Sequence, residues 1–348
     1  MKEELIELLK KLIATPSFSK KENQTADLIL HFLKSKNISC QRKGNNVWAK
    51  SKFWQPNQPT ILLNSHHDTV KPVVGWQRNP YEPSIENGQL FGLGSNDAGA
   101  SLVTLLGTFW HFQNIKLPFN LIFAATAEEE ISGKNGIASI LSELGEIALA
   151  IVGEPTQMQL AIAEKGLMVL DGIAKGKAGH AARNEGINAI DIALQDVVTI
   201  QNFQFEKTSN FLGNIKATVT QIQAGTQHNV VPDTCQFVVD VRTNEQYSNK
   251  SVFELLQEAV QSELIPRSFR LNSSGISPQH PLVQRGIKLG LTCYGSPTLS
   301  DQALMPFPSV KIGPGDSARS HTADEFIRLT EIEQGLNIYK QLLLEWVI

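Results

Sequence analysis

Imidazole and carboxylate side chains directly follow three apolar segments that the sequence predicts to be strands. The segments are residues 61–64, 121–125 and 147–152, and the side chains that follow them are His66, His67 and Asp68, then Glu128, Glu129 and Glu130, then Glu154. In open α/β sheets, ligands bind beyond the carboxyl ends of the strands, so one edge of a sheet would collect these groups. Taken singly, each cluster is as readily a solvated loop or a hydrogen-bonded strand end. Their shared position favours a functional site.

The residue types favour metal-dependent hydrolysis over other chemistry. Imidazole and carboxylate without thiolate are typical of a hydrolytic zinc site. The segment 92–97 is close to a dinucleotide-binding fingerprint, but Asp97 stands at its third glycine position, where a carboxylate would repel a pyrophosphate. The chain has no phosphate-binding P-loop pattern, and the segment that begins at Gly315 lacks the last glycine of a serine-hydrolase elbow.

The composition predicts a chain with a sizeable core and gives no reason to expect a nucleic-acid partner. The length of 348 residues is enough for about two domains, and a hydrophobic fraction of 41% allows a sizeable packed core. The formal net charge of -3 provides no basic face for nucleic acid or an anionic membrane. Three widely spaced cysteines without a CxxC pair indicate neither a disulfide framework nor a thiolate metal site. The acidic amino terminus and the short apolar runs predict a cytoplasmic protein without a membrane partner.

The elements that must position these residues alternate between helices and strands. Helical periods cover residues 2–13, 24–36, 97–112, 133–144 and 282–291, and a last helix runs to about Trp346 behind a capping box of Thr330 and Glu333. Fully apolar strands between helices are typical of a mostly parallel sheet covered on both faces. From residue 166 the order changes to βαββαβ, a ferredoxin-like arrangement that closes with a strand at 268–271. We predict an α/β catalytic domain from residues 1–165 and 274–348, with an inserted domain at 166–273.

In this order, the motifs resemble those of the co-catalytic zinc deacylases and peptidases. That family includes acetylornithine deacetylase, succinyl-diaminopimelate desuccinylase, aminoacylase and glutamate carboxypeptidases. The matching segments are residues 65–70, 92–97, 126–133 and 152–155, together with His321. Segments 95–100 and 128–133 are most similar to the acetylornithine deacetylase branch. Two positions depart from the family: 98–100 is Ala-Gly-Ala where lysine and glycine are common, and Glu128 replaces an aspartate.

The resemblance implies a metal centre of one or two zinc ions, which cobalt can replace. His66 and Glu154 would hold one ion, Glu130 and His321 the other, and Asp97 would bridge them. Three ligand carboxylates and one bridging hydroxide then balance the four positive charges of two zinc ions, as burial requires. The resemblance makes Glu129 the general base. Asp68 lies two residues beyond His66 on the same side of an extended segment, so we expect it to orient that imidazole, while His67 points away and is structural.

The inserted domain, which the resemblance makes a lid and dimerisation domain, contributes further candidates. His180 resembles a lid histidine that stabilises the oxyanion, within its own subunit or across a homodimer, although a histidine between small residues is also often structural. Asn229 and Arg242 resemble substrate-contacting lid residues. Arg242 suits a substrate carboxylate, and a salt bridge with Asp240 is the alternative. In the catalytic domain, Gly313 either presents its backbone N–H to substrate or is only part of a turn.

The resemblance implies hydrolysis of the amide bond of an N-acyl amino acid. The first hypothesis is removal of acetyl or succinyl from an ornithine or citrulline derivative of arginine biosynthesis. The alternatives are a succinyl-diaminopimelate desuccinylase, or a metallo-dipeptidase or aminoacylase with the same metal chemistry. A hypothesis from another class is a metal-free homologue that serves as a binding protein. Competent residues at all the metal and base positions argue against it.

Overall fold

The computed structural model describes residues 1–344 and divides into two compact units. Unit 1 contains Met1–Ile162, Gly275–Tyr294 and the described residues from Ser300 onward, and unit 2 contains Ala163–Ser274 with Gly295–Leu299. The short segment Gly295–Leu299, expected in the catalytic domain, therefore groups with unit 2. The functional roles of the two units stay predictions. Among the described residues, no helix is long and apolar enough to cross a membrane.

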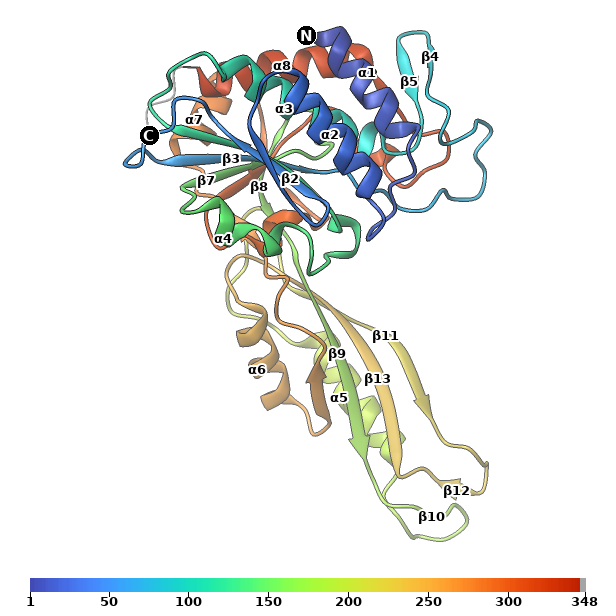
Figure 1. Cartoon of the computed structure of the whole chain (residues 1–348). Helices are drawn as coiled ribbons and strands as arrows, with labels where there is room; N and C mark the ends of the chain where they lie inside the picture. The colour runs from blue at the N-terminus through green and yellow to red at the C-terminus, as the bar shows by residue number, and fades with distance from the viewer. Residues whose placement is uncertain (345–348) are drawn as a thin grey trace. The chain divides into compact units, whose positions relative to one another are not determined.

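Unit 1 is built on a mixed sheet whose central strands are parallel (Figure 1). In spatial order the strands are β1 (Cys40–Lys43), β2 (Asn46–Lys50), β6 (Asn120–Thr126), β3 (Thr60–His66), β7 (Leu149–Val152), β17 (Ser309–Lys311), β8 (Leu160–Glu164) and β15 (Ser274–Gly275), with β16 (Cys293–Ser296) also paired to β8. The pairs β6–β3, β3–β7 and β7–β17 are parallel, whereas β1–β2 and β2–β6 are antiparallel. The α/β class with a mostly parallel central sheet is confirmed.

Helices and short turns cover both faces of this sheet. The first face packs against α1 (Lys2–Ile13), α2 (Asn23–Ser35), α3 (Ala100–Phe112), α7 (Pro281–Lys288) and α8 (Leu329–Leu343), and the other against the turn Ile137–Ser139 and α4 (Leu141–Leu144) (Figure 1). Successive side chains of β3 alternate between the two cores: Ile61 and Leu63 join the first, and Leu62 joins the second. Every residue of β3 and β6 is buried, and the apolar stretch of each strand, residues 61–63 and 121–125, is typical of a strand covered on both faces.

Unit 2 is an antiparallel sheet with two helices packed on one face (Figure 1). The strands follow the spatial order β11 (Lys216–Ala224), β13 (Thr234–Thr243), β9 (Gly166–Lys175) and β14 (Glu263–Pro266), and the helices are α5 (Ala189–Asn202) and α6 (Asn249–Ala259). Alternate residues of β9 are buried, as expected for a sheet covered on one face. A two-stranded ribbon, β10 (Gly179–His180) with β12 (Val230–Val231), completes the unit. Apart from this ribbon, the chain order is βαββαβ.

Two predicted elements are placed or built differently from expectation. The helix predicted over 133–144 is reduced to a short turn and α4. The Glu128 carboxylate accepts hydrogen bonds from the backbone and side-chain nitrogens of Asn135, and these bonds hold the start of the segment in a non-helical conformation. The strand predicted at 268–271 lies earlier, at Glu263–Pro266. There the Gln257 side chain accepts the N–H of Leu264 (2.8 Å) beyond the end of α6, and Leu264 enters the core of unit 2.

The last helix begins differently from the predicted capping box. The Glu331 carboxylate accepts the N–H of Arg328 (2.8 Å), whereas Glu333 pairs with Lys2 (2.8 Å). The predicted end near Trp346 lies outside the described residues. The long segment after β3 contains β4 (Ser84–Glu86) and β5 (Gln89–Phe91). β5 lies between β4 and β18 (Phe326–Arg328) and pairs with both.

Candidate metal centre

The predicted ligands of unit 1 meet at the carboxyl edge of its parallel strands. His66 is the last residue of β3, Glu129 and Glu130 lie in the turn Glu129–Ile131 that follows β6, and Glu154 follows β7. Asp97 lies in the π-helical turn Ser95–Gly99 that opens α3. Parallel strands bring their carboxyl ends to one edge, so segments far apart in sequence supply one site.

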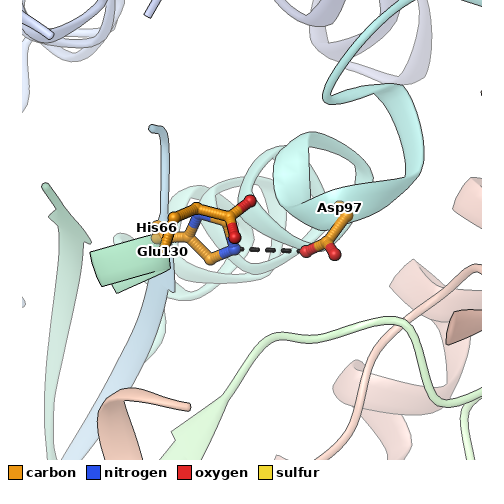
Figure 2. Close-up of side chains that lie close together, drawn as sticks. All are labelled: His66, Asp97 and Glu130. Carbon is orange, nitrogen blue, oxygen red and sulfur yellow. Dashed lines mark hydrogen bonds and ion pairs between the residues drawn. The ribbon is translucent and has the colours of Figure 1, made fainter. Parts of the chain in front are cut away.

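Buried His66 is the centre of the first group of side chains. Its Nε2 lies 3.3 Å from Asp97 Oδ1, 3.7 Å from Glu154 Oε1 and 3.8 Å from Glu129 Oε2. Figure 2 shows its contact with Asp97, beside Glu130. Two sets, His66 with Asp97 and Glu130, and His66 with Glu129 and Glu154, each hold their ligand atoms within 4.8 Å of one another.

His321 completes the other side of the cluster. Its Nε2 lies 3.0 Å from Glu130 Oε2 and 3.7 Å from Asp97 Oδ2. Asp97 therefore directs one carboxylate oxygen toward His66 and the other toward His321. A carboxylate that presents an oxygen to each of two imidazoles has the arrangement of a bridging ligand. The structure thus brings together all six predicted metal and base residues: His66, Asp97, Glu129, Glu130, Glu154 and His321.

The electrostatics of the cluster fit bound cations. Burial raises the pKa of Glu154 to about 8, against the effect of His66. Burial likewise raises the pKa of Glu129 well above its ordinary value, and the Glu154 charge adds to this. Within the described part of the chain, buried Glu154 Oε1 has no hydrogen-bond donor. A buried carboxylate oxygen without a donor, in a group of carboxylates and imidazoles, suits divalent cations, which would offset the crowded negative charge.

Asp68 is fully buried, and its carboxylate fixes the turn that carries the two glutamates. Its Oδ1 accepts the N–H of Glu129 (3.1 Å), and its Oδ2 accepts the N–H of Glu130 (3.2 Å). His66 Nδ1 lies 2.9 Å from the backbone oxygen of Asp68 and 3.5 Å from its Oδ1. The backbone carbonyl of Asp68 is thus the nearer acceptor for the His66 ring, and its carboxylate positions Glu129 and Glu130 as well.

His67 faces away from the cluster, as expected. Its ring nitrogens lie 2.8 Å from Thr25 Oγ1 and 2.9 Å from the backbone oxygen of Asn45. Burial lowers the pKa of His67 to about 4. Its imidazole is therefore neutral and structural near neutral pH.

The remaining candidates are those predicted to contact the substrate, and each has hydrogen-bond partners within its own unit. His180 ends β10 and Asn229 directly precedes β12, and the N–H of Ala181 donates to the Asn229 backbone oxygen (3.0 Å). Arg242 makes two bonds to the Asp240 carboxylate (2.8 and 3.1 Å), which is the salt-bridge alternative. In unit 1, Gly313 donates its N–H to Thr156 Oγ1 (3.1 Å), so the contacts of Gly313 favour the turn alternative.

Glu325 is a buried neighbour of the site that the sequence motifs do not single out. Its carboxylate accepts backbone N–H groups on both sides of Ser95, including that of Asp97. The one signal in the sequence is that it follows His321 by four residues. Burial, which only the fold reveals, distinguishes it from the many solvated acidic residues of the chain.

The fold and the site define a metal-dependent hydrolase of the α/β class. The chain belongs to peptidase family M20/M25/M40, whose model matches residues 62–345. It is 26% identical over 367 residues to a succinyl-diaminopimelate desuccinylase of Helicobacter pylori, with 94% of this chain and 95% of the relative covered. It is also 26% identical to a peptidase M20 domain-containing protein of Schizosaccharomyces pombe over 356 residues, with 98% of this chain and 84% of the relative covered.

Two solved structures show the same fold at low sequence identity. The first is aminopeptidase PepT from Bacillus cereus, with a TM-score of 0.79, 18% identity, and coverage of 99% of this chain and 98% of that one. The second is a dinuclear metal-binding peptidase of the M20 family from Bacillus subtilis, with a TM-score of 0.77, 18% identity, and coverage of 99% and 97%. These relatives support the family and give no specific support to the acetylornithine deacetylase branch.

Proposed function

We propose that the protein is a two-metal hydrolase that removes an acyl group from the amine of an amino acid. The observation that carries this proposal is the placement of Asp97, with one oxygen toward His66 and the other toward His321. His66 and Glu154 would hold one zinc ion and Glu130 and His321 the other, with cobalt as a substitute. The bound ions would lower the pKa of an attacking water and polarise the amide carbonyl.

Glu129 is the proposed general base. Its Oε2 lies on the His66 side of the cluster, whereas the next residue, Glu130, contacts His321, so the two adjacent glutamates can take different roles. Glu129 would take a proton from the attacking water and deliver it to the nitrogen of the amide as the carbon–nitrogen bond breaks. Asp68 supports both glutamates through their backbone N–H groups.

For the substrate, we place an N-succinyl amino acid first. Relatives named succinyl-diaminopimelate desuccinylase match 94% of this chain, and this supports the desuccinylase alternative over the acetylornithine deacetylase reading. N-acetyl or N-succinyl derivatives of ornithine or citrulline, in arginine biosynthesis, remain in the proposal on the strength of the motifs at 95–100 and 128–133. A dipeptide is the third class, since structures of the same fold carry peptidase names.

Unit 2 would supply the groups that stabilise the reacting carbonyl and bind the substrate carboxylate. The N–H of Ala182 donates to His180 Nδ1 (3.1 Å), which leaves the proton of the neutral ring on Nε2. That N–H is a suitable donor to an oxyanion. Asn229 and Arg242 would contact the substrate, and Arg242 would have to exchange Asp240 for the substrate carboxylate. A homodimer through unit 2 and a cytoplasmic location complete the proposal.

A substrate panel tests this function. We would compare kcat/KM for N-succinyl and N-acetyl derivatives of ornithine, citrulline and diaminopimelate, and for a dipeptide, with zinc and with cobalt. The proposal expects metal-dependent release of the free amino acid and a preference for one succinylated substrate. A preference for an ornithine or citrulline derivative, acetylated or succinylated, would favour the first hypothesis, and a preference for the succinylated diaminopimelate would favour the desuccinylase alternative. A chain that binds neither metal and hydrolyses no member of the panel would overturn the function and favour a binding protein.

A further inference from the structure

The segment that carries Asp97 is held by a single buried carboxylate. Glu325, with 2% of its surface exposed, accepts the N–H of Gly94 at Oε2 (3.0 Å) and the N–H groups of Asn96 and Asp97 at Oε1 (2.8 and 2.9 Å). The backbone oxygen of Glu325 accepts a fourth N–H, that of Gly92 (3.0 Å). One residue therefore receives four backbone donors of this segment.

The local backbone explains why an outside acceptor is needed. Within the turn Ser95–Gly99, Asp97 has φ −117° and ψ 101°, which are not helical values, and Gly94 before it has a left-handed φ of 76°. A backbone of this shape cannot give its N–H groups regular helical partners, and buried N–H groups without partners are strongly disfavoured. The Glu325 carboxylate provides those partners from a distant part of the chain.

Glu325 also connects the segments of two proposed ligands. It directly precedes β18, which pairs with β5, and it lies four residues after His321. The Asp97 segment is held to the same region by Asn96, whose side chain exchanges two hydrogen bonds with the backbone of Asp316 (both 3.0 Å). The positions of Asp97 and His321 are therefore fixed relative to each other by contacts on both sides of His321.

We propose that Glu325 is a positioning residue that holds Asp97 as the bridge between the two metal ions. This inference rests on the proposed two-metal function and adds a residue to it. Asp97 can serve both halves of the centre only while its two oxygens keep their separate directions, toward His66 and toward His321. Without the Glu325 carboxylate, the backbone from Gly94 to Asp97 would change conformation to find other acceptors for its N–H groups. Asp97 would then no longer bridge the ion at His66 and the ion at His321. Glu325 itself lies outside the proposed ligand set.

The test is a metal titration of the purified full-length chain and of two variants. Glu325→Met removes the acceptors at similar length, and Glu325→Gln keeps one oxygen for Asn96 and Asp97. Apoprotein would be titrated with cobalt(II) at one pH, with stoichiometry and affinity from calorimetry and spin coupling between the ions from EPR. We expect two coupled ions in the natural chain. In Glu325→Met, we expect the first cobalt ion to bind with natural affinity, the second to bind at least tenfold more weakly, and the spin coupling to disappear. In Glu325→Gln, we expect a smaller loss of affinity for the second ion.

The matched control is Asp196→Leu in unit 2. Asp196 is also buried and accepts backbone N–H groups, from Gln261 (3.1 Å) and Ser262 (2.7 Å), but none of them belongs to a proposed ligand segment. This variant should lower the melting temperature and leave both cobalt affinities and the coupling signal as in the natural chain. If it weakens the second ion as Glu325→Met does, the effect is general destabilisation and the proposal fails.

Three outcomes separate this inference from the function beneath it. Two coupled ions of natural affinity in a folded Glu325→Met variant would overturn the positioning role alone. If Glu325→Met does not fold, the Glu325→Gln variant provides the test. Natural cobalt affinities and natural spin coupling in Glu325→Gln would then overturn the positioning role. A natural chain that binds no metal and hydrolyses no substrate of the panel would overturn the proposed function itself.

Discussion

The imidazoles in the two halves of the proposed metal centre differ in their exposure to solvent. The inner half, around His66, is buried, with 1% of that side chain exposed, and the ring is fixed through Nδ1 by the backbone oxygen of Asp68. The outer half, around His321, leaves 51% of the imidazole exposed, and His321 has a left-handed φ of 58°, which is uncommon outside glycine. We propose that the inner half holds its ion more firmly and that the outer half leaves room for water and substrate.

The adjacent glutamates give the sharpest test of this division. Glu129→Gln removes the base near His66, so we expect kcat to fall by about 10³-fold, within the range for general base catalysis, with both ions retained. Glu130→Gln removes a ligand beside His321, so we expect loss of the outer ion together with activity. Metal analysis of both variants alongside kcat measures this. Loss of metal from Glu129→Gln would mean that the two roles are exchanged.

The imidazoles themselves give the next largest difference. His66→Ala removes the imidazole of the inner half, and we expect loss of the inner ion, because the remaining ligands there are carboxylates that repel one another. His321→Ala should weaken only the outer ion, by about 10²-fold or more, beyond the effect typical for a residue that merely supports a ligand. Cobalt calorimetry on the two variants distinguishes these results. Equal losses in both would remove the distinction between the halves.

The sequence predicted the candidate ligands and one supporting residue, Asp68, but not the other buried carboxylates that support the site. His66, Glu130 and Glu154 follow apolar strands that are recognisable from composition, and parallel pairing brings strand ends together, so a shared edge could be inferred. Glu325 and Glu22 could not be found in this way. Glu22 is fully buried and accepts the N–H of Glu128 (3.1 Å) across 106 residues, and nothing in its local sequence distinguishes it from a solvated helix terminus.

The predicted element boundaries were wrong where side chains form hydrogen bonds with backbone groups that a regular helix or strand would otherwise use. Residues 133–144 carry a helical period, but Glu128 captures Asn135 and only the last turn becomes α4. The closing strand of unit 2 lies several residues earlier than expected because Gln257 bonds to the backbone at Ser262 and Leu264. Such contacts join a side chain to backbone groups several residues away, and the hydrophobic periodicity of a sequence does not predict them.

A pH titration tests whether protonation of His321 controls the metal affinity of the outer half. The hydrogen bond to Glu130, with the charges of nearby carboxylates, raises the pKa of His321 to about 9. An imidazole must be neutral to bind metal, so below that pKa binding of the outer ion releases a proton, and its affinity should rise about tenfold per pH unit from about pH 6.5 to 8.5. Cobalt titrations across this range measure the slope. In His321→Ala the slope for the outer ion should fall by one proton, and an unchanged slope would contradict this assignment.

The smallest expected effect lies outside the metal centre, at Arg242. Its pair with Asp240 leaves 37% of the arginine side chain and 31% of the aspartate exposed, and a pair of this kind contributes about 1 kcal/mol or less to stability. If Arg242 exchanges Asp240 for substrate, Arg242→Ala should raise KM about tenfold for carboxylate substrates with little change in kcat. Asp240→Asn, the matched variant, frees the guanidinium and should leave KM equal or lower. If instead both variants lower the melting temperature alike and leave KM unchanged, Arg242 serves only the strand, and the carboxylate must be bound by another residue.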